Sequence, residues 1–241
     1  MRLPLFRHPF PPPAPATPFH AIGDVHGRLD LLAPLLRRIA RRGSDHPIVV
    51  LGDMIDRGPD SAGVLRLLHH WRHEQLVCLA GNHEAMMLGF LADPVRRAAL
   101  WLRNGGTESL GSFGIAPPDL ATPGAAAECA AALSRALGPM ENWLRGLPLR
   151  WSSGNVVAVH AALDPARPPG MQDEKTLLWG HPRFAGTPRR DGLWVVHGHV
   201  VQDAPSAEGG RIAVDTGAWF TGRLTAARIA EGAVDFVTND G

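Results

Sequence analysis

Apolar runs that end at a glycine alternate with helical patterns in the first third of the chain. Runs of this kind cover residues 19–23, 48–51 and 75–80. Between them, Leu31, Leu32, Leu35, Leu36 and Ile39 recur at helical spacing, and a second helical pattern covers residues 61–71. Unbroken apolar runs of this length are typical of strands buried on both faces. The pattern predicts a β-α-β-α-β unit whose strands pair in parallel through helical crossovers.

The rest of the chain adds a helical segment and then further strands. Residues 84–91 predict a helix, and residues 93–146 predict a helical excursion over the site, with helices at 125–137 and 140–145. Residues 177–184 are interpreted as a loop. The predicted strands are 156–159, 193–196, 211–214, 223–229 and 233–237. Of these, 211–214 and 223–229 are expected to be antiparallel strands, with 233–237 closing the sheet.

Length and composition fit one α/β domain. The chain has 241 residues, 45% of them hydrophobic, so residues 19–241 can bury a substantial core. Residues 1–18 contain Pro11-Pro12-Pro13-Ala14-Pro15 and predict a flexible, solvated polyproline tail. This tail is either a docking peptide for a partner or an inert extension.

Charge and cysteine content exclude several classes of protein. The formal net charge is +1, so no nucleic-acid partner is expected. The chain has no run of 18 apolar residues, and no membrane partner is expected either. Cys78 and Cys129 have no metal-ligand spacing and imply no disulfide framework, which favours a reducing, cytoplasmic location.

Polar residues with metal-binding side chains follow each of the first three predicted strands. They are Asp24, His26, Asp53, Asn82 and His83. Strand ends that continue into glycine-containing loops are where α/β sheets place their sites. Carboxylate, amide and imidazole groups are hard or borderline ligands that suit Mn, Fe or Zn.

The order of these motifs resembles the calcineurin-like metallophosphoesterases. The motifs are GDVHG from Gly23, GDMIDRG from Gly52 and GNHE from Gly81, and VHAA from Val159 and VHGH from Val196 also fit. The Asp-Arg-Gly of the second motif narrows the resemblance to the phosphoprotein phosphatase branch, especially its small bacterial members. The resemblance implies an α/β fold of two packed mixed β-sheets flanked by helices.

The resemblance also implies two divalent metal ions, with Mn as the first choice and Fe and Zn as alternatives. Asp53 lies between the other two motifs in the sequence and is the natural bridging ligand. A hydroxide bridging the two metals would be the nucleophile. The remaining metal ligands implied by the resemblance are Asp24 and His26 for the first ion, and Asn82, His160 and His199 for the second.

Further roles are carried over from the family by the same motifs. His83 would give a proton to the leaving oxygen, and Asp56 would hold its other ring nitrogen. Arg57 would bind the substrate phosphate, because its planar fork matches two phosphoryl oxygens. Bacterial relatives carry Trp-x-Arg where this chain has Trp179-Gly180-His181. The second phosphate-binding arginine is therefore either Arg183 or missing.

The implied activity is hydrolysis of phosphoric monoesters, with a serine/threonine phosphoprotein as substrate. Symmetrical cleavage of diadenosine polyphosphates is the alternative, which would make the partner a small phosphoester. The Asp56-Arg57 pair favours the protein phosphatases, because the dinucleotide hydrolases differ at the aspartate. A phosphoprotein-binding metal scaffold is the non-enzyme alternative, and His83 argues against it because a binder needs no proton donor.

Overall fold

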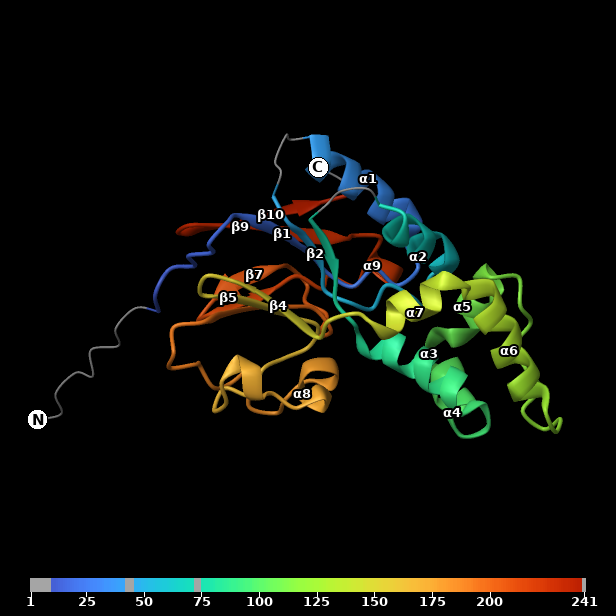
Figure 1. The fold of residues 1–241 in the computed structure, drawn as a ribbon. Coiled ribbons are helices and arrows are strands. Elements are labelled where there is room, and N and C mark those ends of the chain that lie inside the picture. The colour runs from blue at the N-terminus through green and yellow to red at the C-terminus, as the bar shows by residue number, and fades with distance from the viewer. Residues whose placement is uncertain (1–9, 42–45, 72–74, 240–241) are drawn as a thin grey trace, which may run out of the picture.

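Two five-stranded sheets pack face to face, with helices outside them (Figure 1). The structure is a computed structural model, and it describes residues 10–41, 46–71 and 75–239. The strand order is β10-β9-β1-β2-β3 in the first sheet and β4-β5-β6-β8-β7 in the second. Both sheets mix parallel and antiparallel pairs, which confirms the fold class expected from the sequence.

The first sheet contains the predicted β-α-β-α-β unit. β1 pairs in parallel with β2, and β2 with β3, through the helices α1 and α2. β9 and β10 extend the sheet as an antiparallel pair beside β1. The bounds are β1 Phe19–Ile22, α1 Leu29–Arg41, β2 Ile48–Val50, α2 Ser61–His69, β3 Leu76–Cys78, β9 Thr225–Ala230 and β10 Ala233–Thr238.

The second sheet corrects one expectation. The strands predicted at 211–214 and 223–229 are β8 and β9, and they lie in different sheets. β8 pairs in parallel with β6, and the short helix α9 lies between β8 and β9 in the chain. Both strands are apolar enough for either sheet, so pattern alone does not assign them. The bounds are β4 Arg150–Ser153, β5 Val156–Val159, β6 Trp194–His197, β7 Ser206–Glu208, β8 Arg211–Ala213 and α9 Ala218–Thr221.

The segment after β3 is helical, as predicted, and a further helix replaces part of an expected loop. Residues 177–184 were expected to form a loop, but residues 177–179 complete α8, where Leu177 and Leu178 are buried. The bounds are α3 Asn82–Ala92, α4 Pro94–Trp101, a π-helical turn Leu102–Gly106, α5 Thr107–Ser112, α6 Ala125–Leu137, α7 Pro139–Arg145, a 3-10 turn Pro169–Met171 and α8 Glu174–Trp179.

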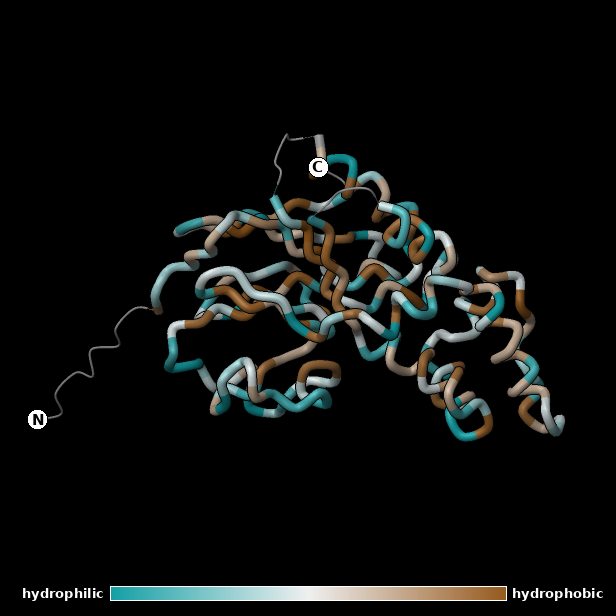
Figure 2. Tube along the Cα trace, in the orientation of Figure 1, coloured by the Kyte–Doolittle hydropathy of each residue, from teal (hydrophilic) through white to brown (hydrophobic). Residues whose placement is uncertain are grey.

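Strand alternation divides the core into layers. In β1, Phe19 and Ala21 face the second sheet, whereas Ile22 faces the helices. In β5, Val156 faces the first sheet and Val157 packs with α8 on the outer face. Figure 2 shows hydrophobic residues concentrated along the central strands of both sheets. The two sheets are therefore held by side chains from both, and their strand ends lie together.

The segment before β1 is packed, which corrects the expectation of a solvated tail for residues 10–18. Asn155 in the turn between β4 and β5 accepts a hydrogen bond from Ala14 N at 2.6 Å and donates one to Pro12 O at 3.0 Å. The Trp194 indole donates to Pro11 O at 2.7 Å, and the Phe10 ring packs edge-on against Trp194. Prolines keep the segment extended and leave its carbonyls free to accept these bonds. Residues 1–9 of the expected tail lie outside the described residues.

No helix in the described ranges combines the length and the apolar character needed to cross a membrane.

The packing of residues 10–18 generates a stability prediction. Asn155→Ala removes two hydrogen bonds to the segment, so we expect the free energy of unfolding to fall by about 1–2 kcal/mol. Chemical denaturation measures this change. Asn142→Ala, on an exposed position of α7, is the matched control and should change stability little. Equal stability of the Asn155 variant and wild type would show that these two hydrogen bonds contribute nothing to stability.

Candidate metal centre

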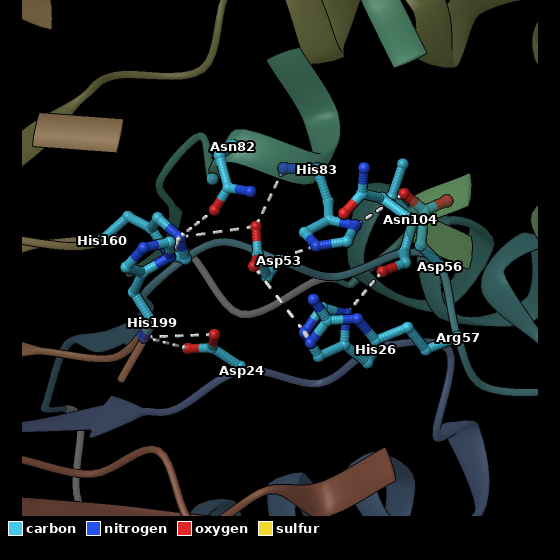
Figure 3. Close-up of polar contacts among 12 residues, drawn as sticks. Asp24, His26, Asp53, Asp56, Arg57, Asn82, His83, Asn104, His160 and His199 are labelled. Carbon is cyan, nitrogen blue, oxygen red and sulfur yellow. Dashed lines mark hydrogen bonds and ion pairs between the residues drawn. The ribbon is translucent and has the colours of Figure 1, made fainter. Parts of the chain in front are cut away.

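The predicted site residues meet at the carboxyl ends of five strands (Figure 3). Each strand delivers its group through the loop or helix start that follows. The residues are Asp24 and His26 after β1, Asp53, Asp56 and Arg57 after β2, Asn82 and His83 at the start of α3 after β3, His160 after β5, and His199 after β6. All are buried except Arg57 and His199, which are partly exposed.

Asp53 lies at the centre of this arrangement. Its Oδ2 is 3.7 Å from His26 Nε2 and 3.8 Å from His83 Nε2. Its Oδ1 is 3.5 Å from His160 Nε2. Two sets of donor atoms, each within 4.8 Å of one another, therefore share Asp53: one with His26 and His83, the other with His160 and His199. One carboxylate between two donor sets is the arrangement that a two-ion centre requires.

The protonation pattern of His160 fits a cation. Its Nδ1 is 3.0 Å from Leu51 O, a carbonyl that can only accept, so Nδ1 carries the proton. Burial lowers the pKa of the imidazole well below its usual range, so the ring is neutral. Nε2 is therefore unprotonated and lies 2.8 Å from Asn82 Oδ1, which places two hydrogen-bond acceptors next to each other. A positive ion between them would turn this repulsion into coordination.

His26 follows the same rule. Its Nδ1 is 2.9 Å from Ile55 O, which leaves Nε2 as a lone pair directed toward Asp53 and Arg57. Arg57 Nη1 donates to this nitrogen at 3.1 Å. A backbone carbonyl that fixes the tautomer is the usual partner of a metal-binding histidine.

A bound cation would also stabilise the buried carboxyl groups of the site in their charged form. Burial is the main cause that raises the pKa of Asp24, and the nearby carboxylate of Asp215 raises it further. Burial is also the main cause that raises the pKa of Asp53, and the carboxylate of Glu84 raises it further. Both oxygens of Asp24 accept from the backbone N–H of His199 at 3.1 Å, so Asp24 lies against the loop of the second donor set. A Cβ at Gly198 would come within 1.9 Å of Asp24 Oδ1, which explains the glycine there. Donor type, tautomers and charge together fit divalent ions.

Asp56 and His83 form a second buried unit beside Asp53. His83 Nδ1 is 2.7 Å from Asp56 Oδ2, the pairing expected from the sequence. Trp101 Nε1 at 3.0 Å and Ser109 Oγ at 2.6 Å also donate to the Asp56 carboxylate. Burial raises the pKa of Asp56 to about 8 and lowers that of His83 to about 3, so between these values the pair holds one proton.

Glu84 has a positioning role that the sequence reasoning missed. It is fully buried and accepts from three backbone N–H groups: Asp53 at 2.9 Å, Met54 at 2.8 Å and Gly81 at 2.7 Å. The carboxylate thus ties the loop after β2 to the start of α3. Its place in the first turn of a helix, directly after Asn82 and His83, was the available signal.

The backbone at the site adopts an unusual conformation. Five non-glycine residues in the described ranges have positive φ: His26 at 47°, Asp53 at 46°, Asp56 at 72°, Arg57 at 68° and His199 at 65°. All five belong to the predicted site. Left-handed conformations of L-residues cost about 1–2 kcal/mol each and persist only where surrounding contacts enforce them.

Arg183, predicted as a second phosphate-binding residue, and His197, to which the sequence assigned no role, have different surroundings. Arg183 is 59% exposed and lies 3.5 Å from Asp164, whose carboxylate is also 3.8 Å from His181 Nε2. His197 is buried, with Nδ1 directed to Gly198 O and its ring against Phe184. His197 does not belong to either of the two donor sets around Asp53, and Arg183 pairs with Asp164 instead. Phosphate binding by Arg183 stays a prediction.

Comparisons with known proteins identify one family for this chain. Residues 17–203 match the sequence model of the calcineurin-like phosphoesterases. Serine/threonine-protein phosphatase 1 of Salmonella typhimurium is 33% identical over 215 residues, which cover 86% of this chain and 90% of that protein. The symmetrical bis(5'-nucleosyl)-tetraphosphatase of Pseudomonas putida is 39% identical, but over 69 residues, 29% of this chain and 24% of that protein.

Solved structures support the fold. One, of a candidate diadenosine tetraphosphatase, has a TM-score of 0.64 at 23% identity and covers 96% of this chain and 98% of its own. A cold-active protein-tyrosine phosphatase of a Shewanella species has a TM-score of 0.60 at 17% identity, covering 91% of this chain and 80% of its own. At these identities, the likeness concerns the fold alone.

The different surroundings of His197 and His199 generate a metal-content prediction. His199→Ala should lose one of two ions per chain, because His199 Nδ1 is 3.2 Å from His160 Nε2 in the second donor set. His197→Ala should keep both, because that ring packs on Phe184. Metal analysis of the two purified variants after loading with Mn measures this. Loss of an ion in the His197 variant alone would reverse the assignment.

Proposed function

Because this chain belongs to the calcineurin-like phosphoesterase family and is a metal-dependent phosphatase, we propose that it removes phosphate from serine or threonine residues of proteins. The observation that carries the proposal is the buried hydrogen bond between Asp56 and His83. It supplies a proton donor for the poor leaving group that an alkyl alcohol makes. The match to a bacterial serine/threonine phosphatase along most of both chains supports the same substrate class.

The proposed ligands divide between two divalent ions that share Asp53. Asp24 and His26 would complete the first ion's protein ligands, and Asn82, His160 and His199 the second's. Two such ions, when bound, polarise the phosphoryl group and generate hydroxide at neutral pH. Mn is the metal we propose, with Fe and Zn as alternatives, because the set mixes imidazole with oxygen donors.

The proposed catalytic groups are His83, Asp56 and Arg57. His83 gives its proton to the departing oxygen, and Asp56 holds the ring so that the other nitrogen faces the cluster. Trp101 and Ser109 hold the Asp56 carboxylate in turn. Arg57, partly exposed at the edge of the cluster, binds two oxygens of the phosphoryl group through its planar fork.

Symmetrical hydrolysis of diadenosine polyphosphates is the second candidate. The local 39% identity to a bis(5'-nucleosyl)-tetraphosphatase favours it over that stretch of the chain. The leaving group in that reaction is a nucleotide that departs through a phosphate oxygen, and it needs less help from a buried acid than an alcohol does. The non-enzyme alternative, a phosphoprotein-binding scaffold, gives no role to the Asp56–His83 pair. The cytoplasmic location expected from the sequence belongs to this proposal as well.

The first prediction tests the metals. Activity toward nitrophenyl phosphate should be lost in excess chelator after extended dialysis, and Mn should restore it better than Mg. Mg prefers oxygen and water ligands, whereas this site would offer it several imidazoles. Steady-state rates with each metal measure the effect. Full activity in chelator would contradict the two-ion assignment.

The second prediction tests the proton donor. His83→Ala should lower turnover of a phosphoserine peptide by roughly 10²–10⁴-fold, the usual scale of general acid catalysis. The loss should shrink for nitrophenyl phosphate, whose leaving group needs little protonation. The bound metal should stay near the wild-type amount. A variant that instead loses an ion would make His83 a ligand.

The third prediction tests the substrate class. With Mn present, kcat/KM for a phosphoserine peptide should exceed that for diadenosine tetraphosphate by at least about tenfold, because the acid pair assists an alcohol leaving group. Released phosphate and separated nucleotides measure the two reactions. The reverse order would replace protein dephosphorylation with dinucleotide hydrolysis.

A further inference from the structure

Four large apolar side chains are exposed together beside the candidate metal centre. Val200 and Val201 follow His199, and Trp219 and Phe220 lie in α9; their exposed fractions are 53%, 43%, 40% and 57%. The Trp219 and Phe220 rings meet edge to face with centroids 5.0 Å apart. We call these four residues the apolar wall.

The two segments of the wall meet at Gly217. A Cβ there would lie 2.4 Å from the Phe220 ring and 3.2 Å from a Val201 methyl group, so both side chains border the same glycine. Gly217 also has a φ of 69°, which starts α9 in the direction that brings Phe220 back over the backbone. The side chains of residues nineteen positions apart thereby form one surface.

The wall is continuous with the site. The Arg57 guanidinium carbon lies 5.5 Å from the centre of the Trp219 ring, a cation–π contact. Arg57 in turn reaches His26 within the donor cluster. At the other end, Val200 directly follows His199. The apolar wall therefore adjoins Arg57, the proposed phosphate-binding residue.

Grouped exposure of this kind differs from the exposure of single apolar residues such as Val95 and Leu120. Val95 and Leu120 are exposed singly, one in α4 and one in the loop before α6. Single exposed apolar residues are ordinary, whereas contiguous ones beside a polar site mark a binding surface. Water around four apolar side chains is released when an apolar group covers them.

We propose that the apolar wall binds an apolar side chain of the phosphoprotein substrate next to the phosphorylated serine or threonine. This rests on the proposed function. Consecutive Cα atoms are about 3.8 Å apart, so a residue one or two positions from the phosphorylated one falls over the wall when the phosphate meets Arg57. Wall contacts do not touch the reacting atoms, so they act on KM rather than on kcat.

The test compares two phosphoserine peptides that differ only in the residues flanking phosphoserine, leucine in one and serine in the other. Wild type should favour the leucine peptide by roughly tenfold in kcat/KM, mainly through KM. In the double variant Val201→Ser/Phe220→Ser this ratio should fall to about one, with the serine peptide hydrolysed at the wild-type rate. The single variant Phe220→Leu, which keeps an apolar side chain, should retain most of the preference for the leucine peptide. Val95→Ser, at a matched exposed apolar position, should retain it fully.

Four results would overturn the proposal. Equal kcat/KM for the two peptides with wild type leaves the wall without this role. An equal loss for both peptides in the double variant would show a structural effect. Loss of diadenosine tetraphosphate hydrolysis alone would assign the wall to a nucleobase. A wild-type dimer that the double variant converts to monomer would assign it to a second copy of the chain. Hydrolysis of nitrophenyl phosphate but of neither peptide would instead refute the proposed function, and the inference with it.

Discussion

The left-handed backbone at the strand ends is the constraint on which the site depends. Five residues that carry site side chains adopt it, and at about 1–2 kcal/mol each it would not persist without compensation. Buried hydrogen bonds supply that compensation. Glu84 accepts from the N–H groups of Asp53 and Met54, and the hydroxyls of Ser61 and Ser109 accept from Asp56 N. The strained backbone allows a short loop after β2 to direct Asp53, Asp56 and Arg57 into one site.

The helical segment after α3 is tied to the same loop. Trp101 and Ser109 hold the Asp56 carboxylate, and Gly105 O accepts from Arg57 N at 3.3 Å. Gly105 has a φ of 104°, and a Cβ there would lie 2.5 Å from Arg57 N, so the close approach needs glycine. Residues 93–146 are therefore more than a cover over the site. They supply part of the hydrogen bonding that holds the Asp56–His83 pair and Arg57, the residue proposed to bind phosphate.

Much of this was predictable from the sequence, for physical reasons. Strands buried on both faces leave unbroken apolar runs, and β1, β2 and β5 were found in this way. The sheet to which β8 belongs was not predictable, because an apolar strand fits either sheet. The chain passes from the second sheet to the first between β8 and β9, and no pattern in the sequence marks this passage. The packing of residues 10–18 was missed because its bonds come from Asn155 and Trp194, which are distant in the sequence. Glu84 was missed because its helix-start position signals only the bond to Gly81 N, whereas its bonds to the N–H groups of Asp53 and Met54 join segments distant in the sequence.

The central claim is that Asp53 is shared between two ions, and the number of ions bound by wild type and by Asp53→Asn tests it most directly. Asparagine keeps the shape and can still accept from His83 N, which donates to Asp53 Oδ1 at 3.0 Å, but it carries no charge to bridge two cations. Calorimetric titration with Mn, checked by elemental analysis, should give two ions per wild-type chain and no tightly bound ion in the variant. Two ions retained by Asp53→Asn, or a single ion in wild type, would contradict the account.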